Sequence, residues 1–301
     1  VVKTGRTHLM DATPIRMSQE MGAWASQLAQ TRRRLQDTRG RLLSLAQGGT
    51  AVGTGLNVPD GFVPAFLAGL QRRTGIAFRA ADDFFAALAS QDTALELSGN
   101  LKVLAATLMK IANDLRWMNS GPWAGLAEIT LPALQPGSSI MPGKVNPVIP
   151  EAVAQAAAQV MGYDAAITVA AQSGNFQLNV MLPLIAHNLL TAMTLLSRAC
   201  RSLGEQAIDG LAVNAEHLRE RLERNPVLVT ALNAVIGYEA GARLAKAALQ
   251  RGVSVREAAK DMTSLTDAEL AQLLDPIVLT RRGIPAMAQA DVDKGPKHGN
   301  E

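Results

Sequence analysis

The stretch LSGNLKVLAATLMKIANDLRWM, residues 97–118, decides the fold. Its apolar residues recur at alternating spacings of four and three, the pattern of a helix that packs lengthwise against other helices. The residues of this seam are Leu97, Leu101, Leu104, Leu108, Ile111, Leu115 and Met118. The sequence therefore predicts a long helix in a coiled-coil-like bundle.

A second long helix is expected before it. Thr13-Pro14 has the pattern of an N-cap followed by proline at the first helical position. After it, apolar residues recur every seven positions, at Met21, Leu28, Leu35 and Leu42. We expect a helix of roughly thirty residues, well beyond the mean of about 11–12.

Two apolar helices are expected to follow, over residues 147–171 and from Phe176 to about Leu203, the second kinked at Pro183. Helices that are apolar on nearly all sides are buried on more than one face. One chain of this size does not easily cover them. We therefore predict an all-α fold whose long-helix bundle forms the helical core of an oligomer.

The sequence pattern changes after about Val213, where the segments expected to be helical become shorter and more charged. Thr266 and Glu269 have the spacing of a capping box at the start of a short helix. We divide the chain into a helical bundle over 1–213, a small C-terminal helical domain over 214–290 and a disordered tail over 291–301.

Composition excludes several classes of function. The net charge of +3 is scattered along 301 residues, so we expect no nucleic-acid partner. Cys200 is the only cysteine, and CxxC and HExxH spacings are absent, so we expect no disulfide, no metal and a reducing cytoplasm. Residues 165–197 carry no charge, but Pro183 and polar residues interrupt them, which argues against a membrane span.

The segment GSSIMPGKVNP, residues 137–147, is the most informative for function. Its glycines and prolines oppose regular structure. Ser138, Ser139, Lys144 and Asn146 supply donors suited to carboxylate oxygens. Pro147 suits the first turn of a helix, whose free N–H groups favour anions. We predict a mobile anion-binding loop.

Two further candidates have ordinary alternatives. His8 lies beside Thr7 on a segment expected to be irregular, and a lone histidine is more often structural than functional. Glu151 falls in the first turn of the helix after Pro147, where the dipole alone explains a carboxylate. The functional alternative is that Glu151 orients or charges His8. The glycine-rich stretch 48–55 lacks the strand and the Gly-Lys-Ser/Thr of a phosphate loop, so we expect a tight turn near the site and no nucleotide.

Together these residues resemble the fumarase/aspartase superfamily over almost the whole chain. Residues 138–146 are similar to its signature loop, Thr7-His8 to a second region, and 49–57, 110–114 and 120–122 to further characteristic stretches. The resemblance implies a homotetramer with active sites shared between subunits. It also implies an N-terminal domain before Val1, carrying a Ser-Ser-Asn type motif for the other carboxylate, and we expect this domain to be missing from the chain.

The chemistry of this family is reversible anti addition of a small nucleophile to fumarate or a related dicarboxylate. The resemblance makes Ser138 the base that removes the Cβ proton through an aci-carboxylate, with helix N–H groups and Lys144 stabilising its alkoxide. It makes Glu151 the partner of His8 and requires no metal or organic cofactor. The substrate-binding residues that it implies are Thr7, His8, Ser139, Lys144 and Asn146.

The choice among family members rests on short stretches. Residues 110–116, 176–181, 254–257 and 275–284 are closer to aspartases, whereas 12–14 and 48–50 are closer to fumarases. We expect an aspartate ammonia-lyase, with fumarate hydratase as the alternative. A non-catalytic structural member of the family is a third interpretation.

Overall fold

The computed structural model describes residues 1–283. The chain forms two compact units. The bundle unit comprises residues 24–212, and the terminal unit combines residues 1–23 with residues 213–283.

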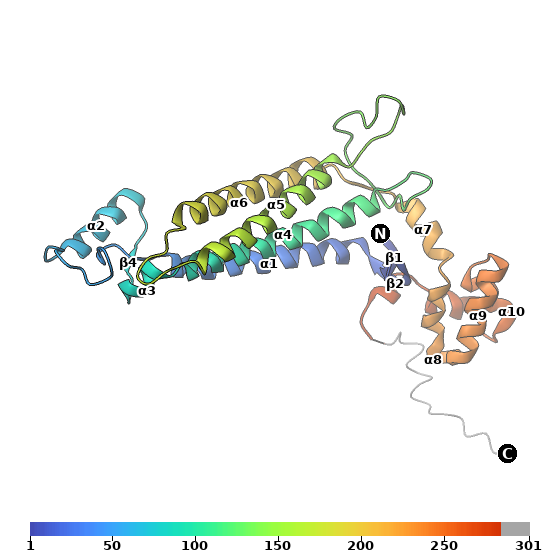
Figure 1. The fold of residues 1–301 in the computed structure, drawn as a ribbon. Helices are drawn as coiled ribbons and strands as arrows, with labels where there is room; N and C mark the ends of the chain where they lie inside the picture. The colour runs from blue at the N-terminus through green and yellow to red at the C-terminus, as the bar shows by residue number, and fades with distance from the viewer. Residues whose placement is uncertain (284–301) are drawn as a thin grey trace, which may run out of the picture. The chain divides into compact units, whose positions relative to one another are not determined.

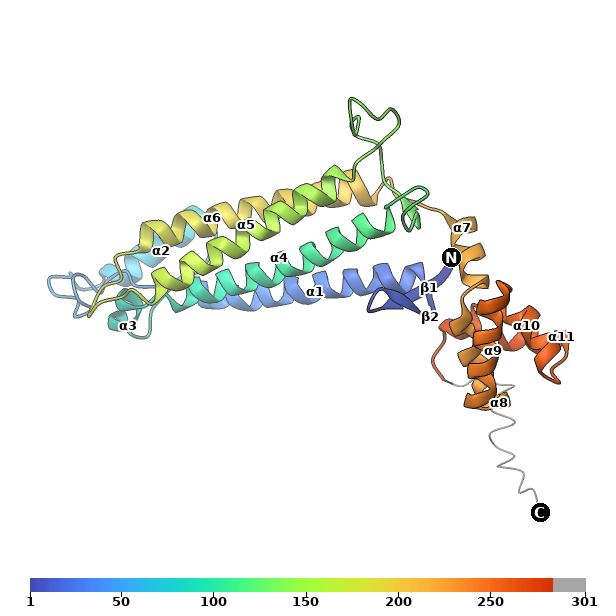
Figure 2. The same ribbon diagram turned by 45° about the vertical axis from the view of Figure 1, so that its right-hand side comes forward.

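Long helices make up the bundle unit. Helices α4 (Asp92–Met118), α5 (Val148–Ala171) and α6 (Leu182–Leu203) pack against one another, and α1 (Met17–Leu42) runs along α4 (Figure 1, Figure 2). The other elements up to Val213 are short. They are β3 (Ser44–Leu45), α2 (Phe62–Thr74), β4 (Arg79–Ala80), α3 (Phe84–Ala89), β5 (Ile129–Thr130), a π-helical turn over Gly204–Ile208, and β6 (Ala212–Val213).

The predicted seam of residues 97–118 is confirmed. Leu101, Leu108 and Leu115 are each at most 5% exposed, and they recur every seven residues along α4. Helices α5 and α6 bury residues at the same alternating spacings, including Val153 and Val160 on α5 and Leu196 on α6. The predicted all-α class is therefore right for the bundle, and the strands of the chain are few and short.

The start predicted for the first long helix is wrong. Thr13 and Pro14 lie in strand β2 (Met10–Arg16), which pairs antiparallel with β1 (Val2–Thr7), and α1 begins only at Met17. Proline is tolerated at position 14 because each strand of a two-stranded hairpin has one unpaired edge. No backbone N–H is needed as a hydrogen-bond donor on that edge. The helix start is marked instead by Gln19, whose Oε1 accepts a hydrogen bond from the N–H of Arg16 at 2.9 Å.

The most buried seam of α1 also differs from the expected one. Positions Met17, Trp24, Thr31 and Thr38 are at most 4% exposed, whereas Leu42 of the predicted series is 37% exposed. The two series lie side by side on the helix, since they are offset by four residues. Two threonines therefore occupy the buried line that faces the bundle.

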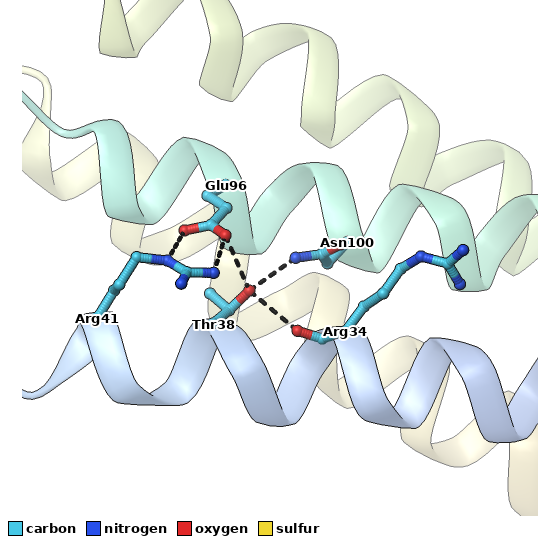
Figure 3. Close-up of polar contacts among 5 residues, drawn as sticks. All are labelled: Arg34, Thr38, Arg41, Glu96 and Asn100. Atoms are coloured by element: carbon cyan, nitrogen blue, oxygen red, sulfur yellow. Dashed lines mark hydrogen bonds and ion pairs between the residues drawn. The ribbon is translucent and has the colours of Figure 1, made fainter.

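Thr38 belongs to a polar cluster that joins α1 to α4 (Figure 3). Asn100 Nδ2 donates to Thr38 Oγ1 at 2.7 Å, and Arg41 Nε donates to Glu96 Oε2 at 2.6 Å. A second Arg41 nitrogen binds the other carboxylate oxygen, which makes the pair bidentate. The hydrogen bond from Arg41 lowers the pKa of Glu96, and Glu96 raises the pKa of Arg41. Directional bonds of this kind fix how far one helix is shifted along the other.

The corner between α5 and α6 was also predicted incorrectly. Helix α6 begins at Leu182, so Pro183 sits in its first turn, where it needs no hydrogen-bond donor, and causes no kink. Asn179 is fully buried; its Nδ2 donates to the carbonyls of Ala170 and Ala171 at 3.0 and 3.1 Å. It thereby adds a partner to two carbonyls in the last turn of α5, of which Ala170 also accepts from Ser173 N–H at 3.2 Å.

The terminal unit combines the β1–β2 hairpin with short helices. These are α7 (Ala215–Glu223), a 3₁₀ turn over Pro226–Leu232, α8 (Asn233–Ile236), α9 (Tyr238–Arg251), α10 (Val255–Met262), α11 (Asp267–Leu273) and a 3₁₀ turn over Val278–Thr280. Their core includes the buried residues Leu232, Leu244 and Leu270. The capping box predicted at Thr266 and Glu269 is present at the start of α11.

The hairpin groups with the C-terminal helices, whereas the sequence analysis placed residues 1–213 in one bundle domain. The physical reason is a set of buried polar contacts within the terminal unit, described below. Nowhere in residues 1–283 is there a helix both long and apolar enough to span a membrane. The tail expected to be disordered, 291–301, lies outside the described residues.

Candidate functional site

The loop from Gly137 to Asn146 is closed at its base by backbone contacts. Gly137 N–H donates to the Lys144 carbonyl at 2.8 Å, and Asn146 Nδ2 donates to the Gly137 carbonyl at 2.9 Å. A Cβ on residue 137 would lie 2.3 Å from the Lys144 carbonyl oxygen, so only glycine fits there. The result is a compact Ω-like loop whose two ends meet.

Four of the predicted site residues lie on this loop. Ser138 is half-buried, and its Oγ accepts a long hydrogen bond of 3.3 Å from the N–H of Ile140. Ser139 and Lys144 are exposed, and within residues 1–283 the Lys144 ammonium has no partner. The side-chain amide of Asn146 closes the base of the loop through its Nδ2. This residue therefore holds the loop in place in addition to being a candidate site residue. A cation, a hydroxyl and backbone donors are therefore available to an anion here.

The loop leads directly into α5. Pro147 is the N-cap residue, and Glu151 lies in the first turn, half-buried. The expectation that the loop ends at a helix N-terminus is confirmed, with Pro147 one position earlier than expected. Of the N–H groups in this turn, Val148 donates to the Asn146 carbonyl at 2.9 Å and Pro150 has none, so Ile149 N–H is the donor left to add positive potential next to Ser138 to Asn146.

Thr7 and His8 lie in the terminal unit, at the tip of the hairpin. Thr7 pairs with Met10, so His8 and Leu9 form a two-residue turn. Their φ angles are 54° and 60°, the left-handed values of a type I′ turn, which normally takes Asn-Gly. The segment expected to be irregular is thus a strand and a tight turn. Strained residues of this kind are concentrated at functional sites.

The structure therefore brings together Ser138, Ser139, Lys144, Asn146 and Glu151 in the bundle unit, and Thr7 with His8 in the terminal unit. Sequence reasoning found the residue types but missed the two-residue turn, because His-Leu is not a usual turn sequence. The one signal was Gly5, where a Cβ would lie 2.7 Å from the Thr13 carbonyl oxygen.

The glycine-rich stretch is at the other end of the bundle unit from the loop (Figure 1). It packs on α3, and a Cβ on Gly53 would lie 2.7 Å from the Phe85 ring. Helix α4 separates the two ends; its 27 residues span about 40 Å at ~1.5 Å per residue. Within one chain the stretch is therefore not near the loop, contrary to expectation.

The residues that the structure describes contain no cluster of histidine, cysteine and acidic side chains suited to a metal. Cys200 is exposed and free, and burial of part of its surface raises the pKa of its thiol.

Comparison with protein families gives two matches. The family described as "Lyase" matches residues 1–162, more than half of the chain, and "Fumarase C C-terminus" matches residues 228–281. Together they cover the hairpin, the signature loop, the start of α5 and most of the terminal helices.

Curated relatives are similar over nearly the whole chain. Fumarate hydratase class II 2 of Pseudomonas aeruginosa is 59% identical over 283 residues, which are 94% of this chain and 62% of that protein. Fumarate hydratase class II of Mycobacterium tuberculosis is 49% identical over 97% of this chain and 61% of that protein. The chain thus spans about three fifths of the length of these relatives. Their names match the alternative interpretation of the sequence and do not support its preference for an aspartate ammonia-lyase.

Solved structures have the same fold. A class II fumarase from Schistosoma mansoni has a TM-score of 0.89 at 37% identity, covering 93% of this chain and 62% of that one. A fumarate lyase:delta crystallin from Brucella melitensis has a TM-score of 0.90 at 43% identity, covering 93% of this chain and 61% of that one. By family match and by identity over most of its length, the chain belongs to the fumarase/aspartase superfamily.

Proposed function

We propose that the complete protein interconverts fumarate and malate, as a class II fumarate hydratase. The observation that carries this proposal is the 59% identity with a Pseudomonas aeruginosa protein of that name. Two hydratases, from Pseudomonas aeruginosa and Mycobacterium tuberculosis, cover 94% and 97% of the chain, so the similarity is not confined to one motif.

In malate dehydration, Ser138 Oγ would take a proton from the carbon next to one carboxylate. The electron pair moves into that carboxylate as an aci-carboxylate, and hydroxide then leaves the neighbouring carbon to give fumarate. Lys144 supports this role because its ammonium is exposed and unpaired within residues 1–283. The positive end of the adjacent helix α5, with the Ile149 N–H, would stabilise negative charge as it develops.

The other candidates would bind and orient the substrate. Thr7, His8, Ser139 and Asn146 offer donors to its carboxylates, and Glu151 would be the partner of His8. The geometry supports these roles for Ser139, Asn146 and Glu151, because all three lie where the loop joins α5.

We also propose a homotetramer with shared active sites. The supporting observations are exposed apolar side chains on the bundle helices, including Val169 at 58% and Leu190 at 65%, and the placing of the glycine-rich stretch and the loop at opposite ends of the bundle unit, along which α4 extends for about 40 Å. A reducing cytoplasm suits a chain whose only cysteine is Cys200.

The test is absorbance at 240 nm, where fumarate absorbs, with L-malate or L-aspartate supplied separately to the complete protein. The proposal expects fumarate from malate and none from aspartate. Fumarate from aspartate alone would replace the hydratase with an ammonia-lyase. No fumarate from either would favour another dicarboxylate or a non-catalytic member.

A further inference from the structure

A buried amide connects the hairpin to the helices of the terminal unit. Asn225 is 2% exposed and lies between α7 and the 3₁₀ turn over Pro226–Leu232. Its Nδ2 donates to Thr4 Oγ1 at 3.2 Å and to the Ala12 carbonyl at 2.9 Å. Its Oδ1 accepts from Val227 N–H at 2.9 Å, which caps the turn. One side chain thus holds both strands of the hairpin and the helical segment.

The contact is made where the hairpin is irregular. The pairing shifts between Thr4 and Arg6, so that Ala12 and Thr13 of β2 lie opposite Gly5 alone. A bulge of this kind leaves one residue outside the ladder, and it bends and twists the strand. Asn225 binds a carbonyl of the bulge, so it stabilises the bend that directs the last pairs of the hairpin, which lead to His8.

The tip itself has little to hold it. Within residues 1–283 the side chains of Thr7 and His8 make no hydrogen bond, and both are exposed. Their place depends on the strands below them. A second fixed point is Lys3, 1% exposed, whose Nζ lies 2.7 Å from Glu20 Oε2 in the first turn of α1. This ion pair holds the start of β1, whereas Asn225 acts closer to the tip.

We propose that Asn225 is a positioning residue for His8, an inference that rests on the proposed function through the carboxylate-binding role of His8. The amide fixes the bulge, the bulge sets the direction of the hairpin tip, and the tip presents the imidazole to the substrate. A two-stranded hairpin is marginal on its own. Loss of the contact therefore displaces His8 without removing any group that touches substrate.

The test compares three variants of the complete protein. Asn225→Asp keeps the size of the side chain and the acceptor for Val227 N–H, but it loses both donated hydrogen bonds. Thr4→Val removes the contact to β1 alone and introduces no charge. Ser254→Ala is the matched control, because it removes an N-cap hydrogen bond in the same unit, at α10, and does not touch the hairpin.

Kinetics with malate give the first measurement. We expect Asn225→Asp to raise KM about tenfold, the equivalent of one charge-assisted hydrogen bond, and Thr4→Val to raise it less. Ser254→Ala leaves KM unchanged. A variant that is merely less stable would lose active protein, which lowers the apparent kcat and does not move KM. An unchanged KM in both Asn225→Asp and Thr4→Val, with the proteins folded, overturns the proposal.

Amide hydrogen exchange of residues 2–16 gives a measurement that does not depend on activity. We expect faster exchange in this segment in Asn225→Asp and normal exchange in Ser254→Ala. If the unmodified protein converts neither malate nor aspartate, the proposed function has failed, and unchanged exchange in Asn225→Asp would then overturn the anchoring role as well. Faster exchange with an unchanged KM would overturn the link to His8.

Discussion

Leu9 is strained by the turn that presents His8. It takes a φ of 60° and is 69% exposed, so it gains little from burial. A left-handed conformation costs an L-residue about 1–2 kcal/mol, which glycine avoids. We therefore expect Leu9→Gly to make the hairpin about 1 kcal/mol more stable than the control Leu9→Ala, which keeps the strain. Amide exchange of residues 2–16 measures the difference, and equal protection in the two variants would contradict a type I′ turn.

Ser138 is the residue on which the chemistry depends. We expect Ser138→Ala to lower kcat by about 10²–10⁴, the usual contribution of a general base. The unfolding midpoint should not move, because Ser138 Oγ accepts only a long 3.3 Å bond from Ile140 N–H. Ser139→Ala is the control, and its effect should fall on KM. If Ser138→Ala kept its turnover with malate, the base would have to be another group.

Two buried threonines of α1 differ in what they contact, which makes them a matched pair at the level of the helix. Thr38 Oγ1 accepts from Asn100 on α4, whereas Thr31 Oγ1 donates to the Gln27 carbonyl of its own helix at 3.0 Å. We expect Thr38→Val to be about 1 kcal/mol less stable than Thr31→Val, because only the first leaves a donor on the partner helix unpaired. Urea unfolding measures this difference. Equal stabilities would contradict a stabilising role for the polar cluster in Figure 3.

Helix α10 begins with a capping box whose carboxylate titrates. Hydrogen bonds from the N–H and then the hydroxyl of Ser254 lower the pKa of Glu257 from its ordinary 4.5. A lowered folded pKa stabilises the protein above the unfolded pKa, and this contribution is lost as pH falls through the folded value. We expect acidification below pH 4.5 to loosen the start of α10 in the unmodified protein.

Glu257→Gln gives the comparison, because glutamine also completes a capping box and does not titrate. Amide exchange at residues 255–258 should then vary less with pH than in the unmodified protein. Glu257→Ala, which lacks the box, should exchange faster at every pH. An identical pH dependence in Glu257→Gln and the unmodified protein would contradict the assignment.

The elements could be predicted from sequence where apolar spacing alone determines them. The seam of α4 is of this kind, since Leu101, Leu108 and Leu115 are all buried. The prediction of helix boundaries failed where a polar side chain determines the local structure. Thr13-Pro14 looks like a helix start but lies in a strand held by Asn225, and the apolar run before Leu182 is a corner held by Asn179. The spacing of apolar residues carries no information about such side-chain hydrogen bonds.

For the whole molecule, the sequence identified the family and the loop but not the arrangement of the site. Donors spaced closely from Ser138 to Asn146 point to an anion whatever the fold, because they are neighbours in the chain. The grouping of the hairpin with helices more than 200 residues later depends on long-range contacts such as Asn225 with Thr4. The preference for an aspartate ammonia-lyase rested on short stretches, whereas a relative similar over 94% of the chain is named a fumarate hydratase.

The most direct measurement incubates fumarate with the complete protein in D₂O and follows the products by proton NMR. We expect malate with a single deuterium at C3 and one diastereomer only, as anti addition requires. Ser138→Ala under the same conditions should leave fumarate unchanged. Loss of fumarate only when ammonium is present, with aspartate as the product, would contradict the hydratase, and equal amounts of two malate diastereomers would contradict the anti mechanism.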